Sequence, residues 1–205
     1  KPMIEYSIDA AKKANIFDKI ILNSDDKIFS KIAKRNSIEF FHRPLHLGGS
    51  EIKSDDVVAN FLDNFPCEII VWANPIAPLQ TIEDIRNTIN FFIKNDLDSL
   101  FTVKSEQVQC IYQNNPINFS VSGKFEQTQN LEPVYPFVPF LMIWRSKSFL
   151  KSYKEKGNGF FCGKVGYFPV SRRSSIIIKY EEDFRLAEQI IQSDQKEKNK
   201  ISYFK

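Results

Sequence analysis

The sequence predicts an α/β protein with a doubly wound, mostly parallel sheet and a small projecting segment of hairpins and loops. Strand patterns and amphipathic helix patterns alternate over residues 4–104, which is typical of parallel sheets with right-handed crossovers. Residues 68–73 are an unbroken apolar run after an initial Glu, as expected for a central strand that is buried on both faces. Residues 105–140 then break the alternation with polar sequence rich in Asn and Gln.

Each element in the first half of the chain has a local signal. Ile4, Ile8 and Ala11 recur at helical spacing, and residues 24–26 and 54–56 are acidic capping sequences. Pro75 and Pro78 force the chain out of the sheet, because proline cannot donate a hydrogen bond to a ladder. The expected elements are helix 4–16, strand 19–23, helix 24–36, strand 39–41, helix 54–62, strand 68–73, helix 81–95 and strand 99–104.

The second half resumes the same pattern after the polar stretch. We expect strand 140–144, helix 147–154, strands 165–169 and 176–178, and an amphipathic helix over 181–192. Residues 1–192 are therefore interpreted as a single domain, with residues 105–140 projecting from it. Residues 193–205 are lysine-rich and are predicted to be a polar, solvated tail.

Composition excludes several classes of function. The 28 basic residues nearly balance the 25 acidic ones, so no general field favours nucleic acid or a membrane surface as a partner. No apolar run approaches the roughly 20 residues that a bilayer span needs. The three cysteines are widely spaced without a metal-binding pattern, which favours reduced core thiols in a cytoplasmic protein over disulfides or zinc.

Asn74 stands at the carboxyl end of the predicted central strand. In open α/β sheets, ligands bind at this edge, and a polar side chain between two rigid turns suits contact with a small ligand. A plain strand-to-helix turn without a ligand is the alternative.

Several short motifs occur in order along the chain. They are KPMIEYSI at 1–8, NSD at 23–25, RP at 43–44, NPIAPLQ at 74–80, DS at 98–99, TQNLEP at 128–133, ED at 182–183 and AE at 187–188. Across almost the whole chain, this set resembles the acylneuraminate cytidylyltransferases, the CMP-sialic acid synthetases and their relatives acting on other nonulosonic acids.

The resemblance implies a homodimeric, Rossmann-like nucleotidyltransferase. Such an enzyme transfers CMP from CTP to the anomeric hydroxyl of an acidic nine-carbon sugar, releases pyrophosphate and uses Mg²⁺, in the biosynthesis of surface polysaccharides. The family's glycine-rich phosphate loop precedes its first helix. The resemblance therefore implies that this loop and the first strand lie upstream of Lys1.

The resemblance also assigns candidate ligand-binding residues. Arg43, Ser54 and Asn74 match positions near the nucleotide, and the alternatives are that Arg43 simply pairs with an acidic helix start and that Ser54 is only a helix cap. Asp25 is most simply an N-cap. Asn74, Gln80, Gln127 and Gln129 match sugar-side positions, where Gln80 and Gln127 replace basic residues of the family.

The family's metal-binding Asp-Ile-Asp is replaced in this chain by Ile177, Ile178 and Lys179. Side chains two apart on a strand share a face, which is how two aspartates hold one Mg²⁺. An alkyl chain and an ammonium cannot do so. Lys179 either supplies positive charge in place of the ion or simply points to solvent.

Two functions are consistent with these observations. The first is an active cytidylyltransferase, and the alternative is a catalytically impaired relative that acts as a nucleotide- or sugar-binding or regulatory subunit. The resemblance also implies that the region of residues 119–140 contacts a second subunit. Its candidate apolar contacts are Phe125, Tyr135, Phe137 and Phe140, and core packing within one subunit is the alternative for each.

Overall fold

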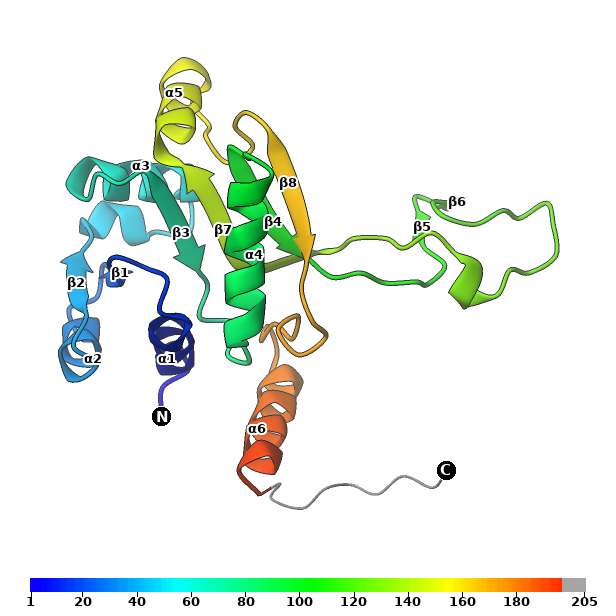
Figure 1. Ribbon diagram of the computed structural model, residues 1–205, viewed down its shortest axis with the longest axis horizontal. Coiled ribbons are helices and arrows are strands. Elements are labelled where there is room, and N and C mark those ends of the chain that lie inside the picture. Colours follow the sequence, from blue (N-terminus) through cyan, green and yellow to red (C-terminus); the bar gives the residue numbers. More distant parts are fainter. Residues whose placement is uncertain (197–205) are drawn as a thin grey trace.

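The computed structural model describes residues 1–196, which fold around a four-stranded sheet with helices on both faces (Figure 1). The helices are α1 Ile4–Ala14, α2 Phe29–Arg35, α3 Ser54–Asn64, α4 Ile82–Lys94, α5 Ser146–Lys156 and α6 Glu181–Lys196, with 3₁₀ turns η1 Leu45–Gly48 and η2 Thr128–Asn130. The strands are β1 Ile21–Ser24, β2 Glu39–His42, β3 Ile69–Ala73, β4 Ser99–Val103, β5 Ile111–Tyr112, β6 Asn115–Pro116, β7 Phe137–Arg145 and β8 Val165–Pro169.

The main sheet has the strand order β3-β7-β4-β8, and β7 alone runs antiparallel to its neighbours. Strands β1 and β2 form a separate parallel pair. The prediction that residues 68–73 form a central strand is wrong, because β7 inserts between β3 and β4 and leaves β3 at an edge of the described sheet. Strands β7 and β4 are the inner strands instead, and all five residues of β4 are buried.

Helices pack on both faces of the main sheet and form two apolar clusters. On one face, α4 contributes Ile85, Ile89 and Phe92 to a cluster with Leu100 and Leu141. On the other face, helices α3 and α5 pack against β3, β4 and β7; the residues there include Val58, Leu62, Phe101, Trp144 and Phe149. This two-sided arrangement is that of a doubly wound α/β fold.

Helix α1 links the main sheet to the β1–β2 pair. Ala10 and Ala14 belong to the cluster that α4 forms, whereas Ile8 packs with Leu22 of β1 and Ala33 of α2. Figure 1 shows α1 between α2 and α4. The helix therefore fixes how the two sheets sit relative to each other.

Two boundaries near the carboxyl end differ from the prediction. Residues 176–178 are not a strand: the Ile178 N–H donates to the Ile76 carbonyl oxygen at 2.9 Å, without a continuing ladder. Helix α6 extends to Lys196, so residues 193–196 are helical rather than part of a tail; residues 197–205 of the predicted tail lie outside the described residues. Among the described helices, none is both long and apolar enough to cross a membrane.

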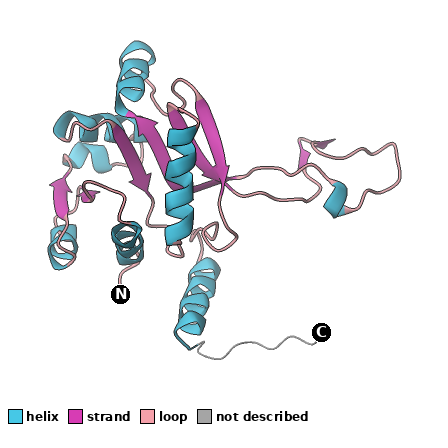
Figure 2. Ribbon diagram, viewed as in Figure 1, coloured by secondary structure: helices cyan, strands magenta, loops and turns pink. Residues whose placement is uncertain are grey.

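Residues 104–136 project from the sheet as an arm between β4 and β7 (Figure 1). At its base, the Lys104 N–H donates to the Pro136 carbonyl oxygen at 2.9 Å. Figure 2 shows that the arm is mostly loop, with the short hairpin β5–β6 and the turn η2. Residues 137–140, which were predicted to project, lie in β7, and the side chain of Phe140 is fully buried in the core.

Carboxamide side chains hold the arm together, in addition to the short β5–β6 ladder and a backbone bridge between Glu106 and Val134. Asn118 accepts a hydrogen bond from the Cys110 N–H at 2.9 Å and donates to the carbonyl oxygens of Val108 and Glu132. Gln107 and Gln109 each donate to further carbonyl groups of the arm. Leu131 is buried, but most other large apolar side chains of the arm are exposed, and they include Ile111, Tyr112, Ile117, Val121 and Phe125.

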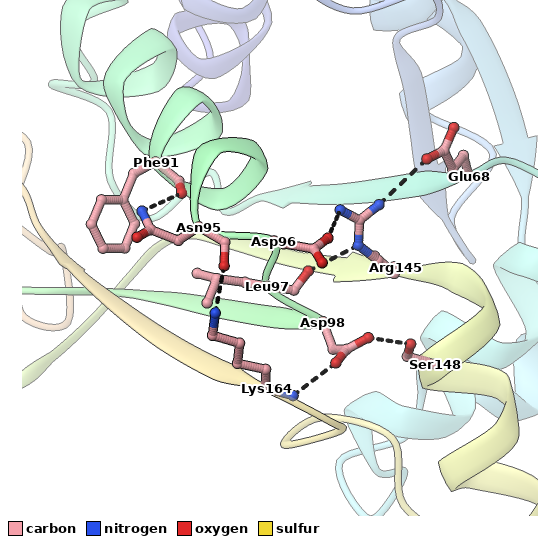
Figure 3. Close-up of polar contacts among 9 residues, drawn as sticks. All are labelled: Glu68, Phe91, Asn95, Asp96, Leu97, Asp98, Arg145, Ser148 and Lys164. Atoms are coloured by element: carbon pink, nitrogen blue, oxygen red, sulfur yellow. Dashed lines mark hydrogen bonds and ion pairs between the residues drawn. The ribbon is translucent and has the colours of Figure 1, made fainter.

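A polar network closes the end of the sheet where β4 begins and β7 ends (Figure 3). Asp98 accepts hydrogen bonds from the Ser148 hydroxyl and from the Lys164 N–H, and these lower the pKa of its carboxyl group. Arg145 donates to the Leu97 carbonyl oxygen and pairs with Asp96. The network joins α4, β7, α5 and the loop before β8 at the edge opposite the carboxyl ends of β3 and β4.

Candidate active site

The residues that follow β1 and β2 lie at one edge because the two strands pair in parallel, with Ser24 opposite His42. The Arg43 Nη2 atom donates to Asp25 Oδ1 at 2.6 Å, and the Arg43 side chain is only 16 % exposed. The prediction that Arg43 pairs with an acidic helix start is confirmed. Contact of Arg43 with a nucleotide stays a prediction.

Capping of the helices next to this edge differs from expectation. The Asp26 carboxylate accepts the Ile28 N–H at 2.9 Å in the turn before α2, whose N-cap residue Ile28 has no side-chain cap bond, so the prediction that Asp25 is an N-cap is wrong. Asp25 is committed to Arg43 instead. Ser54 is exposed at the first position of α3, and no side-chain hydrogen bond caps that helix, so the prediction that Ser54 is only a cap is wrong.

The backbone of η1 lies directly against the Asp25 carboxylate. A Cβ atom placed on Gly48 would stand 2.2 Å from Asp25 Oδ2, far inside van der Waals contact. Only glycine allows η1 to approach the ion pair this closely. The Asp25–Arg43 pair is thus enclosed by β1, β2 and η1.

The loop after β3 is held by its own polar side chains. Asn74 Oδ1 accepts the Ile76 N–H at 3.2 Å, and the Gln80 Nε2 atom donates to the Asn74 carbonyl oxygen at 3.0 Å. The same Nε2 atom donates to the Ser7 hydroxyl of α1 at 3.2 Å. Asn74 and Gln80 therefore lie together and fix the shape of this loop, while the sugar-side role that the resemblance gives them stays a prediction.

Four buried polar side-chain atoms have no hydrogen-bond partner among the described residues. They are Asn23 Oδ1 in β1, Arg43 Nε after β2, Gln80 Oε1 just before α4 and Asn60 Oδ1 in α3. A buried unpaired polar group costs about 1–3 kcal/mol, so such groups are usually satisfied by a ligand, water or further protein. The first two stand at the carboxyl ends of β1 and β2, which favours this region as the candidate site.

The remaining predicted sugar-side residues lie elsewhere in the chain. Gln127 and Gln129 are exposed on the arm, where the Gln129 Nε2 atom donates to Gln127 Oε1 at 2.6 Å. Figure 1 shows η2, which contains Gln129, well away from the end of β3. Within one subunit, the structure does not bring Gln127 and Gln129 to Asn74 and Gln80.

The residues at the family's metal positions do not fit a divalent cation. Ile177 packs against the core cluster of the main sheet, and Lys179 is exposed. The nearby Asp183 carboxylate accepts the N–H groups of Lys179 and Tyr180, both at 3.0 Å, which lowers its pKa. Among the described residues, no three His, Cys, Asp or Glu side chains gather to hold a metal ion.

One buried carboxylate near the site was not identified as important from sequence. Asp84 in the first turn of α4 accepts hydrogen bonds from Ser171 and Ser174 as well as from Thr81. The capping pattern from Thr81 to Asp84 was visible, but the serines are about 90 residues further along the chain. No local signal could connect them.

Comparison with known proteins finds relatives that are similar in sequence to nearly the whole chain. The "Post-translational flagellin modification protein B" of Campylobacter coli is 26% identical over 209 residues, which cover 96% of this chain and 85% of that protein. An N-acylneuraminate cytidylyltransferase of Streptococcus agalactiae serotype V is 24% identical over 199 residues, covering 90% of this chain and 46% of that protein. The chain thus spans about half the length of that relative.

A solved structure shows the same fold. The 4-diphosphocytidyl-2C-methyl-D-erythritol synthase of Anaerococcus prevotii superposes with a TM-score of 0.67 at 16% identity, over 94% of this chain and 86% of that chain. The profile of the cytidylyltransferase family matches residues 1–200, and its match over nearly the whole sequence shows that this chain belongs to that family.

Proposed function

We propose that this protein transfers CMP from CTP to a sialic-acid-like nonulosonic acid for the synthesis of surface polysaccharides. The anomeric hydroxyl oxygen would form a bond to the α-phosphorus, and the bond to the pyrophosphate leaving group would break. The family match over residues 1–200 carries this proposal. The name of the Streptococcus agalactiae relative, an N-acylneuraminate cytidylyltransferase, supports the class of sugar.

We assign Arg43 to the binding of the nucleotide. Its guanidinium is held by Asp25, yet Nε still lacks a partner among the described residues. A guanidinium fixed in this way suits an anionic ligand, since its charge is permanent and its donors are preorganised. Ser54 and Asn74 are assigned to the nucleotide by the resemblance, and Asn74 and Gln80 to the sugar.

Lys179 is proposed to supply positive charge near the phosphates. Its backbone N–H is fixed by Asp183, and its side chain is exposed. Mg²⁺ is expected from the resemblance, but the residues at 177 and 179 do not fit it, and we assign no step to the ion. Full activity of Lys179→Ala, together with complete loss of activity on chelation, would contradict this role.

A further strand is proposed between β1 and β3. Within the described residues, β1 pairs only with β2, and β3 pairs only with β7, so each has a free edge. Unpaired backbone groups favour pairing with another strand. Such a strand would complete one continuous sheet and would bring the phosphate-binding loop that the resemblance implies.

A homodimer would give the arm a binding surface. Phe125 is 84 % exposed and Val121 is 78 % exposed, which is unusual for large apolar side chains and favours burial in an interface. Contact with a second subunit is also how Gln127 and Gln129 would reach a sugar. Sedimentation should show a dimer, and Phe125→Ser should weaken it; a monomer at micromolar concentration would contradict the proposal.

The proposed location is the cytoplasm, where CTP is made. All three cysteines are free thiols, which supports a reducing compartment. Of these, Cys162 is buried, Cys110 is half-buried and Cys67 is exposed, so only Cys162 is the core thiol that the sequence predicted.

The test is pyrophosphate release from CTP with a panel of nonulosonic acids, using the whole polypeptide. Arg43→Gln should lower CTP affinity by about 10-fold or more, since a hydrogen bond to a charged group contributes about 1.5–3 kcal/mol. Arg145→Gln is the matched control, because Arg145 lies in the network at the opposite edge. CTP binding without pyrophosphate release would indicate a binding subunit instead of an enzyme.

A further inference from the structure

The Asp84 carboxylate is buried without a cation beside it. It is 8 % exposed, and no ion pair joins it to Lys, Arg or His among the described residues. Burying an ionised carboxylate is costly unless hydrogen bonds replace its lost hydration. The position therefore depends on the donors that surround Asp84.

Four donors from two distant segments surround this carboxylate. Oδ2 accepts the hydroxyls of Thr81 at 2.7 Å, Ser171 at 2.5 Å and Ser174 at 2.6 Å. Oδ1 accepts the Ser171 N–H at 3.2 Å. Thr81 belongs to the loop after β3, whereas the two serines form a turn after β8.

The two segments also contact each other directly. The Thr81 N–H donates to the Ser174 hydroxyl oxygen at 3.1 Å. Beyond that turn, the Ile178 N–H donates to the Ile76 carbonyl oxygen at 2.9 Å, and Ile177 packs into the core. The segment 174–179 thus runs beside the loop 74–81, and Asp84 is the point where both are fixed.

Capping of α4 does not require this arrangement. The Asp84 N–H already donates to Thr81 Oγ1 at 3.0 Å, which is the ordinary N-cap bond. A cap would leave the carboxylate exposed near the helix end, where it is well hydrated. Its burial under two serines instead joins separate parts of the chain.

We propose that Asp84 is a positioning residue, which holds the loop 74–81 and the segment 174–179 in the arrangement that nucleotide transfer requires. This inference rests on the proposed function, because the loop carries Asn74 and Gln80 and the segment carries Lys179. Asp84 itself does not touch substrate. Its loss lets the two segments separate, and a misplacement of about 1 Å in an active site can cost about 100-fold in rate.

The test compares Asp84→Asn with Asp98→Asn. Asparagine keeps the shape of aspartate but presents an NH₂ group toward hydroxyls that need an acceptor. Asp98 is a matched control, because Ser148 and Lys164 hold it by similar hydrogen bonds at the opposite edge of the sheet. Four quantities are measured for each variant: the urea midpoint, kcat, KM for CTP, and the hydrogen-exchange rate of the peptide containing Ile178.

Asp84→Asn should lower kcat about 10- to 100-fold with a smaller change in KM, since positioning acts on the reacting geometry. Exchange at Ile178 should become faster. Asp98→Asn should lose stability, while its kcat and its exchange at Ile178 stay within about two-fold of wild type, because the effects of distant sites are independent. An unchanged exchange rate in Asp84→Asn, or equal kcat in the two variants, would overturn the proposal.

Two further outcomes are also informative. If Asp84→Asn does not fold, Ser174→Ala removes one donor and one acceptor from the same network, and Ser148→Ala is its control. The same changes in kcat and exchange are then required of Ser174→Ala. Wild-type protein that releases no pyrophosphate contradicts the proposed function, whereas an active wild type with equally active variants contradicts only the role of Asp84.

Discussion

Replacement of Gly48 by alanine should disrupt the Asp25–Arg43 ion pair, because the added Cβ atom would clash with the Asp25 carboxylate. The added Cβ atom would lie 2.2 Å from Asp25 Oδ2 and 2.5 Å from Asp25 Cγ, so the carboxylate must move. Rotation of the Asp25 carboxylate away from this clash is costly, because its Oδ1 atom forms an ion pair with Arg43 Nη2 at 2.6 Å. The pair therefore has to open, or η1 has to shift.

The magnitude follows from the exposure of the two side chains. Arg43 and Asp25 are 16 % and 30 % exposed, so solvent screens their interaction only in part. A hydrogen bond between charged groups contributes about 1.5–3 kcal/mol, and the loss of backbone entropy in the unfolded chain returns about 0.4–1 kcal/mol. We expect Gly48→Ala to lower the free energy of unfolding by about 1–2 kcal/mol.

Urea unfolding measures this effect, with Gly49→Ala as the control. A Cβ atom on Gly49 would meet its nearest neighbour, Ile52 Cγ1, at 3.8 Å, which is ordinary contact. With a slope near 2 kcal/mol per M, Gly48→Ala should lower the urea midpoint by about 0.5–1 M, while Gly49→Ala should leave it unchanged or slightly raised. Equal midpoints for the two variants would refute the reasoning. In an Arg43→Gln background, the cost of Gly48→Ala should shrink, because the pair is already lost.

Three other predictions concern stability and reactivity. Gly163→Ala and Gly157→Ala each place alanine at positive φ, which costs each variant about 1–2 kcal/mol of stability. Calorimetry should show the larger loss of stability for Gly163→Ala, because its Cβ atom would lie 2.1 Å from Asp98 Oδ2. Burial alone would raise the pKa of Asp84, but its hydrogen bonds more than offset the effect of burial and lower the pKa. The stability that the ionised Asp84 carboxylate contributes is therefore present above about pH 4 and is lost as the pH falls through the folded-state pKa. An Asp84→Asn variant should lose less stability on acidification than wild type, measured by urea unfolding from pH 6 to pH 3. Burial raises the pKa of the Cys162 thiol to about 11, so mass spectrometry after labelling at pH 8 should find Cys162 modified only in urea; rapid modification in the native protein would contradict its burial.

Local signals located the helices, and they predicted the ends of α4 correctly but the start of α2 too early, since α2 begins at Phe29 and not at residue 24. Thr81 is the N-cap of α4 and Asn95 is its C-cap, as expected from sequence. The run of isoleucines at 176–178 was misleading, since β-branched residues favour strands but only one ladder-like bond forms there. The place of β3 in the sheet depends on β7, which arrives from about 70 residues later. Strand order of this kind is not visible in local sequence.

The contacts of the candidate site were predictable only where the residues involved are close in sequence. The motif at 74–80 places Asn74 and Gln80 in one loop, and a short separation in sequence makes that contact unavoidable. Pairing of Arg43 with an acidic helix start was one possibility from sequence, and the structure shows its ion pair with Asp25, while its contact with a nucleotide stays a prediction. The donors to Asp84 come from the turn after β8, and nothing in the serine spacing indicates which carboxylate they meet.

In the arm, the side chains that hold the backbone in place differ from the side chains that are exposed on its surface. Its path depends on amides such as Asn118, whose partners are all backbone groups and so are indifferent to neighbouring side chains. Its outward residues, such as Val121 and Phe125, carry no part of that scaffolding. Mutation of these residues can therefore change the surface that the arm presents while the course of its backbone is preserved.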